Sequence, residues 1–205
     1  MLTGQDTIFS ALEAYQDPKI REFARQASIQ EAEGYGERDQ HPYVKKPIKP
    51  RVQETWEFAQ RMGYRKVGLA FCAGLAAEAR MVADLFSAQG LEVVSVVCKV
   101  GAVPKESLGL TNEEKVRPGG QESMCNPISQ AHLLNRAGTE LNILLGLCVG
   151  HDALFTQHAD APALCWPSRT GSPATTPWPP STPSAPTTSG SSPCDSALQS
   201  FTHWP

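Results

Sequence analysis

The sequence has no run of about 18 apolar residues, so it contains no transmembrane helix of ordinary length. It also lacks a strong charge of either sign, because 18 Lys and Arg stand against 21 Asp and Glu, a net charge of −3. We therefore expect neither nucleic acid nor a membrane as a partner. The N-terminus lacks the basic start and apolar core of a secretory signal, which favours a cytoplasmic protein.

Several short motifs are missing as well. There is no CxxC, which argues against a thioredoxin-like protein, and no GxGxxG or GxxxxGK[ST], so nothing indicates a dinucleotide site or a P-loop. Six cysteines are present without a secretory signal. In a reducing compartment such thiols serve more often as metal ligands, reactive groups or core residues than as disulfides.

The N-terminal part is predicted to be helical. Ile20, Phe23 and Ala27 recur at roughly helical spacing, and Pro18 suits a first helical turn. The pattern predicts helices at 5–16, 18–33 and 51–62. Residues 36–50 carry three Pro and many charges, which is typical of an exposed connection. We therefore assign 1–50 to a helical segment with a charged linker.

From residue 66 onward, short apolar runs alternate with amphipathic segments. The pattern predicts buried strands at 66–72, 91–98 and 141–148, and helices at 74–90 and 126–138. Apolar strands that alternate with amphipathic helices indicate an α/β fold, with a mostly parallel sheet and helices on both of its faces. We assign this domain to residues 51–162.

Each predicted strand ends in a cysteine, and ligands of open α/β sheets bind beyond the carboxyl ends of the strands. A fourth cysteine directly precedes the helix capped by Asn126, and a histidine follows the last strand in a Cys-x-x-His spacing. Thiolates and imidazole are ligands of zinc, and thiolates also hold iron–sulfur clusters. The leading hypothesis is a metal-binding protein of unknown reaction whose ligands come from Cys72, Cys98, Cys125, Cys148 and His151.

Two other functions fit the same residues. Cys72 lies at a strand-to-helix turn, where a helix N-terminus lowers the pKa of a thiol, so it is also a candidate nucleophile of a thiol-dependent enzyme with His151 as base. Alternatively, the cysteines are ordinary buried residues of a small-molecule-binding domain. No motif in the sequence indicates which protein partner, if any, the chain binds.

Four segments together resemble a known family. They are EAEGY (31–35), RMGYRKVGLAFCAGLAAEA (61–79), MCNP (124–127) and GLCVGHD (146–152). The chain is identified over roughly residues 20–162 as similar to a metal-binding family of bacteria and archaea, DUF1847, a domain of unknown function. The resemblance implies a metal-associated α/β domain. The chain departs from the family in having no Cys-rich segment before Cys72, and Gly101 instead of a second thiol after Cys98.

Residues 163–205 differ from the rest in composition. Nine Pro and sixteen Ser or Thr occupy 25 of these 43 positions, which predicts a disordered tail. The family that the chain resembles ends instead with a strand and a helix. A reading shifted from the third codon base of Leu164 can encode a strand, a turn and a helix that match this ending. We therefore predict a frameshift near Leu164.

Overall fold

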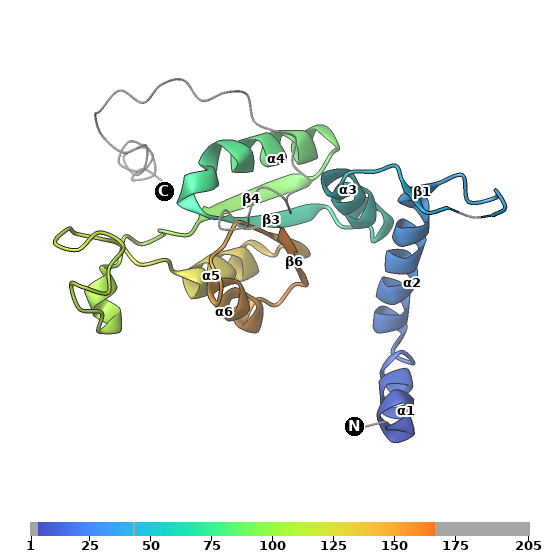
Figure 1. The fold of residues 1–205 in the computed structure, drawn as a ribbon, viewed down its shortest axis with the longest axis horizontal. Helices are drawn as coiled ribbons and strands as arrows, with labels where there is room; N and C mark the ends of the chain where they lie inside the picture. Colours follow the sequence, from blue (N-terminus) through green and yellow to red (C-terminus); the bar gives the residue numbers. More distant parts are fainter. Residues whose placement is uncertain (1–3, 43, 167–205) are drawn as a thin grey trace. The chain divides into compact units, whose positions relative to one another are not determined.

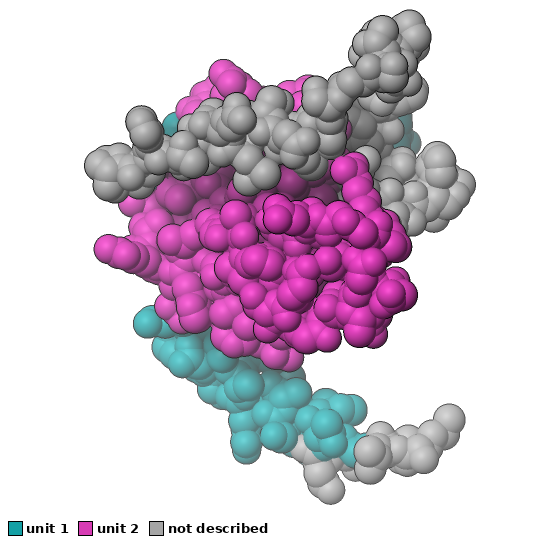
Figure 2. Space-filling model, turned by 90° about the vertical axis from the view of Figure 1, so that its left-hand side faces the viewer, with its two compact units in different colours: residues 1–65, 89–91 teal, residues 66–88, 92–205 magenta. Residues whose placement is uncertain are grey.

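The computed structural model describes residues 4–42 and 44–166, and these form two compact units. One comprises residues 1–65 and 89–91, and the other comprises residues 66–88 and 92–205 (Figure 2). The part of the predicted disordered tail that follows residue 166 lies outside the described residues. Among the described residues, no helix is both long and apolar enough to cross a membrane.

The second unit is built on a four-stranded parallel sheet, as the alternating pattern predicts. Its strands are β3 (Lys66–Phe71), β4 (Glu92–Val97), β5 (Leu141–Leu145) and β6 (Ala163–Trp166), in the order β4-β3-β5-β6. The register places Phe71 beside Val97 of β4 and beside Leu145 of β5. The carboxyl ends of these three strands therefore lie level at one edge of the sheet.

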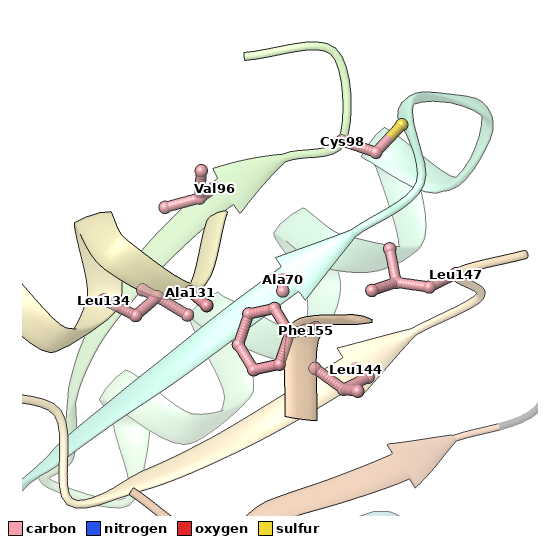
Figure 3. Close-up of a cluster of buried hydrophobic side chains, with 8 residues drawn as sticks. All are labelled: Ala70, Val96, Cys98, Ala131, Leu134, Leu144, Leu147 and Phe155. Atoms are coloured by element: carbon pink, nitrogen blue, oxygen red, sulfur yellow. The ribbon is translucent and has the colours of Figure 1, made fainter. Parts of the chain in front are cut away.

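Helices cover both faces of this sheet (Figure 1). Helix α4 (Ala76–Ala88) lies on one face, where the Phe86 ring meets the Trp166 indole edge-on at 6.2 Å between centroids. Helices α5 (Pro127–Ala137) and α6 (His151–His158) cover the other face. A cluster of buried side chains lies beneath them (Figure 3), namely Ala70, Val96, Cys98, Ala131, Leu134, Leu144, Leu147 and Phe155.

The first unit is helical, as predicted. It contains α1 (Gln5–Ala14), α2 (Pro18–Glu33) and α3 (Arg51–Arg61), with the short antiparallel pair β1 (Tyr35–Gly36) and β2 (Lys46–Pro47) in the connection. Phe23 of α2 packs edge-on against Phe58 of α3, with 5.1 Å between ring centroids. The Glu57 carboxylate joins the same helices, because it accepts hydrogen bonds from Gln30 at 2.8 Å and Lys49 at 2.7 Å.

Two predicted boundaries are wrong. The third strand ends at Leu145 rather than at Cys148, because Gly146 turns the chain with φ +67°. Residues 163–166, assigned above to a disordered tail, form β6 instead, and this strand pairs in parallel with β5. The composition of 163–205 is dominated by Pro, Ser and Thr that begin only after Trp166, which hid this short apolar strand.

Candidate thiol cluster at the carboxyl ends of the strands

The sheet order places a change of direction between β3 and β5. From β3 the chain passes through α4 to β4 on one side, and then through α5 to β5 on the opposite side of β3. The strand order reverses between β3 and β5, and such reversal points are where open α/β sheets bind ligands. Cys72 directly follows β3 here, and its N–H donates to the Leu145 carbonyl oxygen at 3.0 Å.

Cys72 and Cys98 lie on the face covered by α5 and α6. Successive side chains of a strand alternate between faces, and the two cysteines follow Ala70 and Val96 of the buried cluster by two residues. Cys98 is only 3% exposed. Figure 3 shows it just past the end of β4. The N–H of Ala73, at the start of the turn into α4, donates to Cys98 Sγ at 3.3 Å.

Cys125 reaches the same place from a distant part of the sequence. The backbone leaves β4 and returns just before α5, where the Asn126 N–H donates to the Cys98 carbonyl oxygen at 2.7 Å. Asn126 also caps α5, as predicted, since its side chain accepts from the N–H of Ser129 at 3.1 Å. These two bonds fix Cys125 beside Cys98, where it packs against the buried cluster.

The intervening residues 99–124, which we call the β4–α5 excursion, are closed at their base by backbone pairing. The Met124 N–H donates to the Val103 carbonyl at 2.8 Å, and the Lys105 N–H donates to the Glu122 carbonyl at 2.9 Å. The Lys99 ammonium donates to the Ser123 carbonyl at 2.5 Å, which brings a positive charge next to Cys125. The base of the excursion thus places the Lys99 ammonium close to the Cys125 thiol.

The pKa values of the paired thiols move in opposite directions. Hydrogen bonds to the Cys125 and Cys72 sulfurs, and burial, raise the pKa of Cys98. The hydrogen bond with Cys98 lowers the pKa of Cys125 to about 5, and positive charge at Lys99 and His151 contributes to this shift. Cys125 is therefore a thiolate near neutral pH and Cys98 remains a thiol.

Cys148 and His151 stand at the margin of this cluster. Cys148 is exposed, and its pKa is raised by burial of part of its side chain and by negative charge at Cys125 and Cys72. His151 begins α6, where its N–H donates to the Cys148 carbonyl at 2.9 Å. The carboxylate of Asp152, in the first turn of α6, accepts from the N–H of Ala153 at 2.8 Å.

All five predicted ligands thus lie in one region, but not in a coordination sphere. Within residues 4–42 and 44–166, no three His, Cys, Asp or Glu side chains are arranged so that one ion could bind them. The two described cavities are elsewhere. One of about 330 Å³ is lined by Val100, Gly101, Ser129, His132, Leu133 and Arg136, and one of about 430 Å³ by Asp152, Ala153, Thr156, Gln157 and Cys165.

Gln130 was not predicted as a site residue, but its side chain binds the backbone near the ends of β3 and β4. Its side chain is fully buried, and its amide donates to the Val96 carbonyl at 2.7 Å and to the Phe71 carbonyl at 3.4 Å. Phe71 directly precedes Cys72, and Val96 lies two residues before Cys98. A polar residue within the apolar stripe of Pro127, Ala131 and Leu134 was the signal that could have revealed it.

Comparison with known proteins agrees with the resemblance seen in the sequence. The family model described as "Protein of unknown function (DUF1847)" matches residues 2–165. An uncharacterised protein of the archaeon Methanocaldococcus jannaschii is 41% identical over 143 residues, which cover 70% of each chain. The chain therefore belongs to the DUF1847 family of proteins of unknown function.

Proposed function

We propose that the chain binds a metal, either a zinc ion or an iron–sulfur cluster, at the thiols of Cys72, Cys98 and Cys125. One observation carries the proposal: Cys72 and Cys125 pack against the buried cluster that contains Cys98, although the three thiols come from separate segments of the chain. Convergent thiolates are the donor set that selects these metals. Cys148 and His151 are at hand as further ligands.

The chemistry of the donor set fits a metal, although the side chains must rotate to meet it. A zinc ion binds thiolate sulfur at about 2.3 Å, so the three sulfurs have to turn toward a common centre and lose their protons. Cys125 meets the second requirement in advance, because its pKa is about 5. Cys72, Cys98 and Cys125 would hold the metal, which would supply Lewis-acid or electron-transfer chemistry.

A thiol-dependent enzyme is the second candidate. The sequence favours Cys72 as its nucleophile. The cluster offers Cys125 as a further candidate, because its pKa is lowered and the charge of His151 acts on it. The third possibility is a small-molecule site with incidental cysteines, and it would lie in one of the two described cavities, neither of which is lined by Cys72, Cys98 or Cys125.

The metal content of protein purified without oxygen tests the proposal. We expect stoichiometric zinc or iron by elemental analysis, and iron with sulfide would add visible absorption. Titration of chelator-treated protein with Co²⁺ should give the near-ultraviolet sulfur-to-cobalt bands of thiolate coordination. The variants Cys98→Ser and Cys125→Ser should each weaken binding by more than about tenfold.

Cys165→Ser is the matched control, because Cys165 is an exposed thiol on β6 outside the cluster. It should bind metal as the wild type does. Metal-free wild-type protein that gives no thiolate bands with Co²⁺, or bands that survive in Cys98→Ser and Cys125→Ser alike, would overturn the proposal. Circular dichroism of each variant separates loss of ligand from loss of fold.

A further inference from the structure

We propose that Cys98 and Cys125 form a reversible disulfide when a hydroperoxide reaches the metal-free thiol cluster. The inference stands on geometry. Cys125 packs against the buried cluster that contains Cys98, and the Asn126 N–H to Cys98 carbonyl bond of 2.7 Å already joins the two backbones. The disulfide therefore closes a contact that the fold has made, without moving a strand.

The exposure of the two thiols assigns their roles. Cys125 is partly exposed, so a small oxidant can reach it, whereas Cys98 is 3% exposed and protected. Cys125 is thus the thiol that reacts first, and Cys98 is the resolving thiol directly behind it. This arrangement protects Cys125 from oxidation to the sulfinic acid, because the resolving sulfur is already within reach.

The chemistry balances in two steps. Cys125 attacks the terminal oxygen of the hydroperoxide, the O–O bond breaks, and an alcohol or water leaves as Cys125 becomes a sulfenic acid. The Cys98 sulfur then attacks the Cys125 sulfur, the S–O bond breaks, and the hydroxyl leaves as water with the Cys98 proton. Two thiols are oxidised by two electrons and the hydroperoxide is reduced by two.

Cys72 is the competing partner, since it packs against the same cluster and the N–H of the next residue, Ala73, donates to Cys98 Sγ at 3.3 Å. It is held in the sheet region, where its N–H donates to the Leu145 carbonyl and it follows β3 in register with Cys98. Cys125 directly follows the β4–α5 excursion, and the bond from the Asn126 N–H to the Cys98 carbonyl holds its backbone beside that of Cys98. We therefore assign the disulfide to Cys125.

The disulfide would also switch off the metal site, and this consequence rests on the proposed function. Two of the three core thiolates are consumed when the bond forms, so the oxidised protein should bind Zn²⁺ at least about tenfold more weakly than the reduced protein. A bound metal should in turn protect both thiols, because its ligands are not free to attack a peroxide.

Tryptic peptide mapping tests the disulfide without reference to metal. Chelator-treated full-length protein is exposed to equimolar hydrogen peroxide, remaining thiols are alkylated, and the protein is digested without reductant. Trypsin places Cys72 in peptide 67–80, Cys98 in 81–99 and Cys125 in 116–136, because the Arg117–Pro118 bond resists cleavage. We expect peptides 81–99 and 116–136 to be linked with the loss of two hydrogens, and to separate with dithiothreitol.

Two cysteine variants provide the control and the test of the proposed disulfide. Cys165→Ser should form the same link, whereas Cys125→Ser should not. A link from 81–99 to 67–80 instead, no link at all, or irreversible oxidation of Cys125 in the wild type would overturn the assignment. A linked peptide pair in a protein that binds no metal when reduced would refute the proposed function and leave the disulfide standing.

Discussion

The N–H of Asn126 donates a hydrogen bond of 2.7 Å to the carbonyl oxygen of Cys98, and this bond closes the β4–α5 excursion. Because Asn126 also caps α5, the start of that helix is tied to the end of β4. Cys125 is held between these two anchors. The paired thiols thus owe their position to a backbone contact rather than to each other.

The lowered pKa of Cys125 predicts how stability depends on pH. Between pH 5 and 9 the folded chain holds Cys125 as a thiolate, while the unfolded chain, with an ordinary thiol pKa of 9.0, still binds that proton. The unfolded state binds more protons, so the stability of the metal-free protein rises with pH across this window and is lost as the pH falls toward 5. Urea titrations at a series of pH values measure it.

Cys125→Ser should flatten this pH dependence, since the variant has no thiolate at position 125. Cys165→Ser provides the comparison and should retain the slope, because burial and the charge of Asp152 raise the pKa of Cys165 rather than lower it. Equal slopes in the two variants would refute the assignment of a thiolate to Cys125.

Gln130→Met removes the amide that joins α5 to the strand ends while it keeps the side-chain volume. The Val96 and Phe71 carbonyls then lose the hydrogen bonds that they accept from Gln130 in a buried place. We expect the free energy of unfolding to fall by about 1–2 kcal/mol. Gln157→Met, at an exposed position of α6, should change it by less than about 0.5 kcal/mol. Similar values for both would show that Gln130 contributes no net bond.

Gly68→Ala tests the packing between β3, β5 and α5. A Cβ at position 68 would lie 2.1 Å from Asn142 Oδ1 and 2.7 Å from Leu134 Cδ1, and both neighbours are fully buried. Relief of this overlap should cost about 1–3 kcal/mol of stability. In Gly120→Ala the new Cβ meets nothing closer than 3.4 Å, so that variant should unfold at the wild-type urea concentration. A tolerated Gly68→Ala would mean that β3 and β5 separate readily.

Glu57 predicts an acid-sensitive step in the helical unit. Burial would raise the pKa of Glu57, but hydrogen bonds from Lys49, Gln30 and Gln53 outweigh it and lower the pKa to about 2. The stabilisation is present above the ordinary pKa of 4.5 and is lost as the pH falls toward 2. Acid titration followed by circular dichroism should show this loss in the wild type.

Glu57→Gln should remove that acid step and lower stability near neutral pH, because Lys49 loses its closest carboxylate, 2.7 Å away. Glu22→Gln is the comparison, since Glu22 forms an exposed pair with Arg25 at 3.3 Å, and it should titrate as the wild type does. A Glu57→Gln variant with an unchanged acid step would contradict the prediction.

The coding sequence near Leu164 supplies the last prediction. The family match ends at residue 165, and the Pro, Ser and Thr of the C-terminal segment begin directly after Trp166. We predict that sequencing of the gene from the codons of Ala161 to Trp166 finds one base gained or lost relative to the family reading frame. An intact frame there, with the printed tail recovered from the native protein by mass spectrometry, would refute the frameshift.

Local patterns in the sequence determined most of the fold. The apolar runs at β3, β4 and β5 and the Asn126-Pro127 start of α5 are signals carried by a few adjacent residues, so they predicted the parallel sheet and its covering helices. The ends of the strands were predicted less well than their existence. Gly146 ended β5 three residues early, and β6 has only four residues beside a segment of contrasting composition.

Only the tertiary structure decided how the thiols are related. The sequence placed Cys72 and Cys98 at neighbouring strand ends, but the 26 residues between Cys98 and Cys125 could have carried the latter anywhere. Backbone hydrogen bonds across the base of the β4–α5 excursion bring it back. The pKa of a thiol depends on charges and donors within a few ångströms, so the lowered pKa of Cys125 follows from the fold and could not be predicted from its place in the sequence.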